Sequence, residues 1–299
     1  MLDKHAQRID IFNSTLDILR QGSYRTTDGK RNELPNVKDV MASAKMYREP
    51  FSNSLCVDLA AGAEESFKPT EVRVEEKDCV LAAKQLIDEG YNPAMLNLAD
   101  LYTPGGLVEY GSGAQEENLC RRSNLILSLY QFSHARIYEY PDLGLIKAKE
   151  QYPMDVRFGG VYSGTVAFFR GPESQGSMLE DKMYNIPVIS VAAISGPQIM
   201  SDGMINSVEA EITLDKMRTI FRIGLDNGHD SLVLSAFGCG AFANPPAHIA
   251  KLFHQVMEED EFRNWYRLIV FAILDGYRTG MRHNPDGNLK PFQREFGVY

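Results

Sequence analysis

The second half of the chain alternates strand-like and helical patterns, and this order constrains the fold more than any other feature. Three runs are apolar without alternating in polarity, at 186–194, 231–236 and 268–274. The segments between them, 205–225 and 246–258, repeat apolar residues at spacings of three and four. Such strands are typical of a sheet covered on both faces, and βαβ order favours parallel pairing with right-handed crossovers. We therefore predict an α/β fold, a three-layer α/β/α sandwich.

The first half of the chain carries the same kinds of element in a less regular order. A helical repeat in the first twenty positions precedes the turn-rich stretch 22–36, which predicts an appended N-terminal helix. Further strands are predicted at 55–61, 72–74 and 94–99, and helices at 79–87 and 119–130. Short strands around loops are predicted within 131–185, at 156–158, 161–162 and 166–169. We divide the chain into an N-terminal helical extension, residues 1–50, and a core, residues 51–299.

The charge balance and the cysteines argue against several classes of protein. The chain has 31 Lys and Arg residues against 40 Asp and Glu residues, a formal charge of −9, which disfavours nucleic-acid binding through a broad basic face. Its first residues lack the apolar run of a signal peptide or membrane span, and its four cysteines lie far apart. We expect an intracellular, cytoplasmic protein, or a nuclear one in a eukaryote, that is monomeric and has no membrane partner.

The most informative stretch is residues 97–123, NLADLYTPGGLVEYGSGAQEENLCRRS. It leads from a predicted strand into a predicted helix and has four glycines within nine residues. Glycine frees the backbone for turns and for close approach to a ligand, although a glycine-rich segment is more often a plain surface connection. Because open α/β sheets bind ligands at the carboxyl ends of their strands, we predict a binding site in this loop.

Three polar residues, Gln115, Glu116 and Glu117, open the helix that follows this loop. Acidic residues near a helix N-terminus are favoured by the helix dipole, so their presence alone does not indicate catalysis. Neighbouring helical residues project about 100° apart, so the two glutamates cannot face each other across a glycosidic bond. At most one would donate a proton, and the other could bind hydroxyl groups. Arg121 and Arg122, more than a turn further on, are expected to be solvated or ion-paired.

A second glycine-rich loop, SAFGCGAFANPP at 235–246, joins an apolar strand to a helix. Small residues at Gly238 and Gly240 allow backbone N–H groups to turn inward, and the following helix N-terminus adds positive potential, so a diphosphate could bind here. Cys239 is expected to be a small structural residue, because no nearby histidine or basic residue would lower its pKa. Phe242 could stack on a bound ring or anchor the loop. The six histidines show no metal-ligand spacing, so we expect no metal and no cofactor.

Together these motifs resemble one family. The run Asn97-Leu-Ala with Pro104-Gly-Gly, the segment QEENLCRRS at 115–123 and the segment GCGAFANP at 238–245 resemble the bacterial-type poly(ADP-ribose) glycohydrolases, which are divergent macrodomains. The resemblance is strong over 97–130 and 233–250, and loose in the N-terminal extension and in 131–185. It implies a macrodomain-like sandwich with a mixed, mostly parallel sheet.

The resemblance also implies roles for both loops. In that family a Gly-Gly-Gly loop and a Gln-Glu-Glu triplet surround the terminal ribose, and the second glutamate is the catalytic acid. Carried over, Glu117 would protonate the leaving oxygen at the anomeric carbon, Glu116 would bind the ribose hydroxyls or the leaving group, and Gln115 would hold the loop or the substrate. In the second loop, backbone amides would bind the diphosphate and one aromatic residue would pack near the distal ribose. The implied substrate-binding residues are Asn97, Asp100, Gly105, Gly106 and Leu107 in the first loop, and Gly238, Cys239, Gly240, Ala241 and Phe242 in the second.

Two positions depart from the family pattern. Leu107 stands where the family loop has its third glycine, and Asp100 stands where an asparagine is common. The Leu107 side chain could narrow the pocket or alter the loop path. An ionised Asp100 only accepts hydrogen bonds, so a contact that needs an N–H donor would be lost.

The resemblance implies a hydrolase that cleaves the ribosyl O-glycosidic bond of poly(ADP-ribose) or of ADP-ribosylated macromolecules and releases ADP-ribose. The competing enzyme is a mono-ADP-ribosyl hydrolase. The alternative from another class is a non-catalytic ADP-ribose-binding module, which the departures at Leu107 and Asp100 suggest.

Overall fold

The computed structural model describes residues 3–51, 68–276 and 279–297, and the chain forms two compact units. Unit 1 comprises Met1–Tyr47, Asn97–Met154 and Val161–Val191, and unit 2 comprises Arg48–Leu96, Asp155–Gly160 and Ala192–Tyr299. The strand predicted at 55–61 lies outside the described residues. Division of the chain at residue 50 stays a prediction.

Unit 2 is built on parallel strands. Their order is β5 (Pro93–Leu98), β10 (Ser231–Leu234), β11 (Leu268–Ala272) and β4 (Glu71–Glu75). In this register Val233 pairs with Met95 on one side and with Val270 on the other. Every residue of β10 and β11 is buried, so both faces of these strands are covered, as their unbroken apolar sequence predicts.

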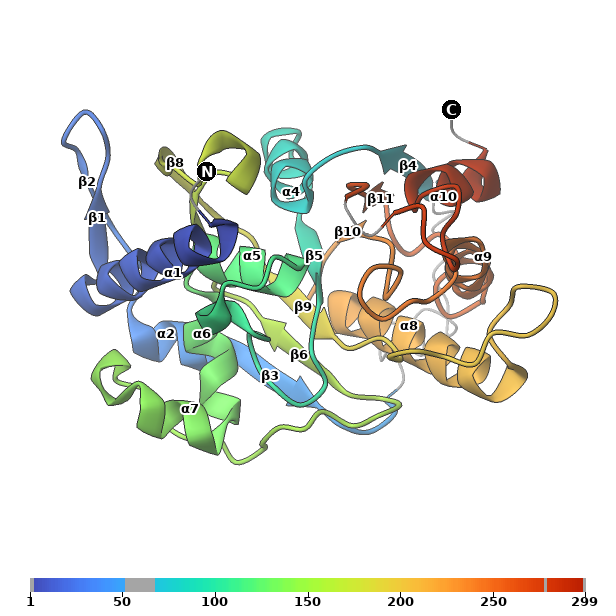
Figure 1. The fold of residues 1–299 in the computed structure, drawn as a ribbon, viewed down its shortest axis with the longest axis horizontal. Coiled ribbons are helices and arrows are strands. Elements are labelled where there is room, and N and C mark those ends of the chain that lie inside the picture. The colour runs from blue at the N-terminus through green and yellow to red at the C-terminus, as the bar shows by residue number, and fades with distance from the viewer. Residues whose placement is uncertain (1–2, 52–67, 277–278, 298–299) are drawn as a thin grey trace. The chain divides into compact units, whose positions relative to one another are not determined.

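Three of the helices described in unit 2 begin and end close to the predicted residues, and the fourth, at 289–296, was not predicted. These helices are α4 (Cys79–Asp88), α8 (Ser207–Asp226), α9 (Pro246–Met257) and α10 (Leu289–Phe296). Helix α4 packs against β10 and β11, and α9 packs against both α8 and α10 (Figure 1). The Phe271 ring lies 5.3 Å from that of Phe253 and 5.1 Å from that of Phe292. Helices and strands of unit 2 therefore share an aromatic core.

Unit 1 contains the antiparallel strands. The strands β3 (Ala44–Tyr47), β6 (Gly160–Ser163) and β9 (Val188–Val191) are neighbours in that order, and β6 and β9 are antiparallel. Two separate antiparallel pairs join β1 (Ser23–Arg25) to β2 (Arg31–Glu33) and β7 (Ala167–Arg170) to β8 (Leu179–Asn185). The seven-stranded sheet is mixed and mostly parallel, which confirms the predicted α/β fold class.

The helices of unit 1 surround the loop that carries the candidate site. They are α1 (Lys4–Gln21), α2 (Val37–Ala42), α5 (Gln115–Arg122), α6 (Leu125–Leu129) and α7 (His134–Glu139), with single 3₁₀ turns at Val108–Tyr110, Tyr130–Phe132, Pro141–Leu143 and Glu173–Gln175. Asp3 caps the start of α1, and Gly22 ends it with a φ of 65°. Its apolar face, with Phe12, Leu16 and Leu19, is buried, and α1 packs against α5 (Figure 1).

Three predicted elements differ in the structure. The single helix predicted from 119 to 130 is wrong, because Ser123 adopts an extended conformation and separates α5 from α6. Its hydroxyl donates to the Leu119 carbonyl and accepts from the Leu125 N–H, so it competes with the helical hydrogen bonds. The strand predicted at 156–158 is a turn, and the strand predicted at 186–194 is limited to Val188–Val191. Among the described residues, no helix is long and apolar enough to span a membrane.

Candidate active site

In unit 1 the loop after β5 folds around the carboxyl group of Glu116. This side chain is 3% exposed and accepts three N–H bonds. Its donors are the backbone of Asp100 at 2.7 Å, the backbone of Gly105 at 3.1 Å and the side-chain amide of Asn97 at 3.3 Å. The end of β5 and the first part of the loop are therefore held to one carboxyl group at the start of α5.

Gln115 and Asn97 fix the end of the strand relative to the helix. The Gln115 side-chain oxygen accepts from the Leu98 backbone N–H at 2.7 Å. Asn97 is fully buried, and its side-chain amide also donates to Ser190 Oγ of β9 at 3.0 Å. Gln115 thus ties the last residue of β5 to the start of α5, and its role toward the loop or the substrate stays a prediction. Sequence reasoning missed Ser190, because no motif marks it and its partner lies 93 positions away.

Glu117 lies beside the same loop, and one of its carboxyl oxygens is unoccupied by the protein. Its Oε1 accepts from the Leu107 backbone N–H at 3.0 Å. Its Oε2 is buried and has no hydrogen-bond partner among the described residues. A buried carboxyl oxygen without a hydrogen-bond partner destabilises the folded protein. A ligand that hydrogen-bonds to this oxygen would supply the missing partner.

The space between the two carboxyl groups and the loop exists because residue 106 is glycine. Gly106 has a φ of 58°, and an added Cβ would lie 2.4 Å from Glu117 Oε1 and 3.3 Å from Glu116 Oε2. Gly105, with a φ of 77°, would place a Cβ 3.3 Å from the Tyr130 ring. Both glycines are therefore required by positive φ and by close approach.

Burial changes the protonation of this site. Burial raises the pKa of Glu116 to about 8, and the nearby charge of Glu117 adds to the rise, while the N–H bonds from Asp100, Asn97 and Gly105 oppose it. The unliganded pair therefore holds a proton at neutral pH. A glycosidase acid needs such a proton at the pH where the enzyme works.

We expect Glu116→Gln to flatten the pH dependence of stability. The pKa of Glu116 is about 8 in the folded protein and about 4.3 for an unperturbed glutamate. The stability that this proton gives is fully present below the unfolded value and is lost as the pH rises through the folded value. Urea unfolding from about pH 4 to about pH 9 should show the variant gaining on wild type with rising pH, by on the order of 1.4 kcal/mol per pKa unit. A difference that stays constant with pH would contradict this assignment; Glu139→Gln, at an exposed glutamate, is the control.

Arg121 connects α5 to other parts of unit 1. Its guanidinium donates to the Ser112 carbonyl at 2.7 Å and lies 3.7 Å from a carboxylate oxygen of Glu173. On α1, the Thr15 hydroxyl donates to the Arg121 carbonyl at 2.6 Å. Arg121 and Arg122 are both buried, so Arg121 is ion-paired as expected and neither residue is solvated. The N-terminal helix α1 thus contacts α5 and helps to hold it in place. No sequence motif indicated this role.

The second glycine-rich loop lies in unit 2 and has a conformation of its own. Gly238 has a φ of 73°, and an added Cβ would lie 2.5 Å from the Asn244 side chain and 2.6 Å from Ala193 Cβ. The Asn244 amide donates to the carbonyls of Ile194 at 2.7 Å and Gly238 at 3.1 Å, which closes the loop. Only glycine fits this position of the bend.

The amides of this loop divide into occupied and unoccupied donors. The Cys239 N–H donates to the Ala236 carbonyl at 3.1 Å, while the N–H groups of Gly240, Ala241 and Phe242 have no acceptor among the described residues. Successive unoccupied N–H groups are suited to bind an anion. Cys239 is fully buried and burial raises the pKa of its thiol, which agrees with a structural role. The Phe242 carbonyl accepts from Gly196, which supports anchoring of the loop.

Comparison with a family model decides the identity of the chain. Residues 13–171 match the family described as microbial-type PARG, catalytic domain, where PARG is poly(ADP-ribose) glycohydrolase. The chain belongs to this family. The predicted resemblance and the predicted class of enzyme, a glycosidase, are therefore confirmed.

Solved structures of bacterial PARGs are similar over nearly the whole chain. The PARG of Thermomonospora curvata is 24% identical, with 96% of this chain and 98% of that chain covered and a TM-score of 0.73. Its complex with the inhibitor ADP-HPD is 25% identical, with the same coverage and a TM-score of 0.70. The PARG of Deinococcus radiodurans in complex with ADP-ribose is 23% identical, with 89% and 99% covered and a TM-score of 0.62. No curated protein sequence matched.

The two departures from the PARG pattern are accommodated locally. Leu107 has a φ of −104°, so the backbone there needs no glycine, and its side chain is 55% exposed while its N–H binds Glu117. Asp100 Oδ1 accepts from the backbone N–H groups of Tyr102 at 2.8 Å and Thr103 at 2.7 Å. Its side chain therefore holds the turn, and an acceptor is what this position uses.

We expect Asp100→Asn to keep activity within about threefold of wild type, because an asparagine oxygen can accept the same two N–H bonds. Asp100→Ala removes the acceptor and should lower activity further, since the turn that presents the Asp100 N–H to Glu116 loosens. Steady-state kinetics on poly(ADP-ribose) should show a smaller loss of activity for Asp100→Asn than for Asp100→Ala. Equal losses in the two variants would show that the carboxylate itself is needed.

Proposed function

We propose that this protein hydrolyses the ribosyl O-glycosidic bond of poly(ADP-ribose) and releases ADP-ribose, with Glu117 as the general acid. The observation that carries the proposal is the buried, unpartnered Glu117 Oε2 beside a carboxyl group that holds a proton at neutral pH. Both carboxyl groups belong to α5 and lie against the preceding loop, which approaches them closely at Gly106. The bacterial PARG structures bound to ADP-ribose and to ADP-HPD support the choice of ligand.

The proposed role of Glu117 requires that the proton held by the pair passes to Glu117 when the substrate binds. The three N–H bonds that Glu116 accepts favour its ionised form and oppose the effect of burial on its pKa. Glu117 accepts one N–H bond and keeps an oxygen for the substrate. Glu117 thus gives its proton to the departing oxygen at the anomeric carbon, and the ionised Glu116 binds the ribose hydroxyls.

Hydrolysis then follows the usual course of glycoside cleavage. Loss of the protonated leaving group develops positive charge on the ribose, and the carboxylates stabilise this charge. Water adds to the anomeric carbon, and its proton returns to Glu117. The substrate-binding role of the second loop, whose N–H groups at residues 240–242 have no acceptor among the described residues, stays a prediction.

The deciding experiment is incubation of the wild-type protein with poly- and mono-ADP-ribosylated protein, followed by mass spectrometry of the released species. Release of ADP-ribose from the polymer supports the proposal. Release from the single-unit conjugate alone would indicate a mono-ADP-ribosyl hydrolase. Tight binding of ADP-ribose in calorimetry with no cleavage of either substrate would indicate a binding module. The cytoplasmic location and the monomeric state stay predictions.

A further inference from the structure

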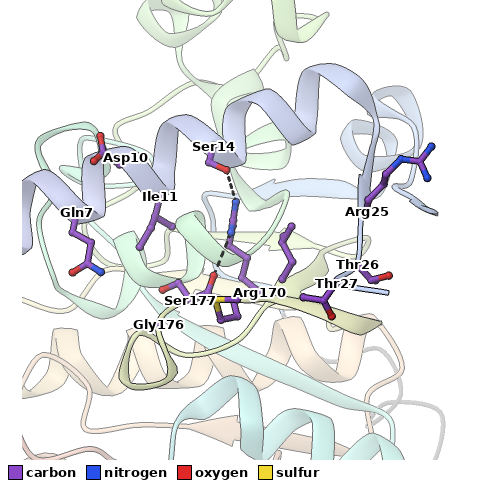
Figure 2. Close-up of a pocket in the computed structure, with 12 residues that line it drawn as sticks. Gln7, Asp10, Ile11, Ser14, Arg25, Thr26, Thr27, Arg170, Gly176 and Ser177 are labelled. Atoms are coloured by element: carbon purple, nitrogen blue, oxygen red, sulfur yellow. Dashed lines mark hydrogen bonds between the residues drawn. The ribbon is translucent and has the colours of Figure 1, made fainter. Parts of the chain in front are cut away.

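A pocket in unit 1, away from Glu117, contains a buried arginine. The pocket has a volume of about 430 Å³ and is lined by one face of α1, by Arg25 at the end of β1 with the following Thr26 and Thr27, and by the turn between β7 and β8 (Figure 2). Arg170, the last residue of β7, is 6% exposed. None of the residues that line this pocket belongs to the candidate active site.

Every hydrogen-bond acceptor of Arg170 is neutral. Its guanidinium donates to Ser14 Oγ at 2.8 Å, to Thr15 Oγ1 at 3.1 Å and to the Ser177 carbonyl at 3.2 Å. A guanidinium has five N–H donors, so these bonds leave part of its capacity unused. Figure 2 shows this side chain reaching from the strand toward α1, across the pocket wall.

Arg170 also lacks a counter-charge within the part of the chain that the structure describes. Burial lowers its pKa, and no carboxylate raises it. In Figure 2 the side chains of Asp10 and Arg25 point away from Arg170, and Arg25 donates instead to the Gly29 carbonyl at 3.0 Å. A buried cation without an anion is costly, because neutral acceptors replace only part of its hydration.

We propose that this pocket binds a phosphate group of an organic phosphate, with Arg170 as the counter-charge and the hydroxyl groups of the pocket wall as further donors. The planar guanidinium fork matches the oxygens of a phosphate and forms strong charge-assisted hydrogen bonds with them. Ser14, Thr26 and Thr27 place hydroxyl groups around the pocket. The volume falls in the range of small-molecule sites, ~300–1,000 Å³, so there is room for more than the phosphate itself.

The first experiment follows the Nε resonance of Arg170 by ¹⁵N NMR during titration with inorganic phosphate. The resonance is assigned by its loss in Arg170→Lys. We expect a saturable shift of the Arg170 signal and none of the Arg25 signal, which belongs to the same pocket but to a side chain that points away. An unchanged Arg170 signal at millimolar phosphate would overturn the proposal, and this readout does not depend on the catalytic loops.

The second experiment supplies the missing counter-charge. Ser14→Glu puts a carboxylate next to the Arg170 guanidinium at an exposed helix position. We expect the affinity of Ser14→Glu for phosphate, measured from the Arg170 shift, to fall at least tenfold, and its Tm to rise. The neutral control Ser14→Gln should keep the affinity of the wild type. Phosphate binding to Ser14→Glu with wild-type affinity would overturn the proposal.

The third experiment identifies the source of the phosphate and rests on the proposed function. If the phosphate belongs to the polymer, Ser14→Glu should raise KM for poly(ADP-ribose) at least threefold, with kcat and the KM for a single-unit conjugate unchanged. An unchanged KM for the polymer, together with loss of the NMR shift, would assign the site to a free organic phosphate. Because the first two experiments need no catalysis, they decide the site even where the proposed function fails.

Discussion

Glu117→Gln is expected to lower kcat on poly(ADP-ribose) by about 10²- to 10⁴-fold, the range that a positioned general acid contributes. The glutamine oxygen can still accept the Leu107 N–H that Glu117 Oε1 accepts at 3.0 Å, so the loop should keep its conformation. The variant loses only the acidic proton at the position of the unpartnered Oε2. The affinity for ADP-ribose, measured by calorimetry, should therefore stay within a few fold of wild type.

The control for this variant is Glu139→Gln, which changes an exposed glutamate of α7 in the same unit. It should leave kcat unchanged and change Tm little, because the ion pair of Glu139 with Arg136 is half exposed on the glutamate side. Full activity of purified Glu117→Gln would remove the proposed acid. A parallel loss of ADP-ribose binding would instead give Glu117 a role in substrate binding.

Gly106→Ala is expected to lower kcat/KM by about 10²-fold, the order of loss that follows a misplacement of about 1 Å at a reacting group. The added Cβ would lie 2.4 Å from Glu117 Oε1 and 3.0 Å from its carboxyl carbon, so the carboxyl group must move. The φ of 58° adds backbone strain on the order of 1–3 kcal/mol, and Tm should fall as well.

A matched control separates the clash from the strain. Gly144, also in unit 1, has a φ of 70° and no atom within 4 Å of an added Cβ. Gly144→Ala should lower Tm with little effect on kcat/KM, while Gly106→Ala lowers both. Equal kinetic effects in the two variants, or full activity of Gly106→Ala, would show that the close approach to Glu117 is unimportant.

Part of the candidate site followed from residue patterns. The Gln-Glu-Glu triplet at the start of a helix and the glycines of the preceding loop predicted a site between them, and Glu116 binds the N–H groups of Asp100 and Gly105 there. These contacts join residues of one strand-loop-helix unit, so the local sequence pattern was enough to predict that they lie together. The effect of Leu107 was less predictable, because it depends on where a side chain points, and this one points largely into solvent.

Other features required the folded chain. Thr15 and Arg121 are 106 positions apart, and Arg170 reaches Ser14 across 156 positions. No sequence pattern showed that Arg122 would be fully buried or that Ser123 would break the helix after α5. At this break Ser123 also forms a bridge with Phe168 of β7, which lies 45 positions away.

The sequence by itself determined the α/β class, the parallel strands of unit 2 and the family, because apolar runs, helical spacing and short motifs are local properties of the chain. Only the tertiary structure decided which oxygen of Glu117 has no partner among the described residues, that burial raises the pKa of Glu116, and that Arg170 is paired with no carboxylate in the described part of the chain. Solvation and electrostatic environment are set by all the groups that fold around an atom. Most of those groups are distant in sequence, so their effect exists only once the chain has packed.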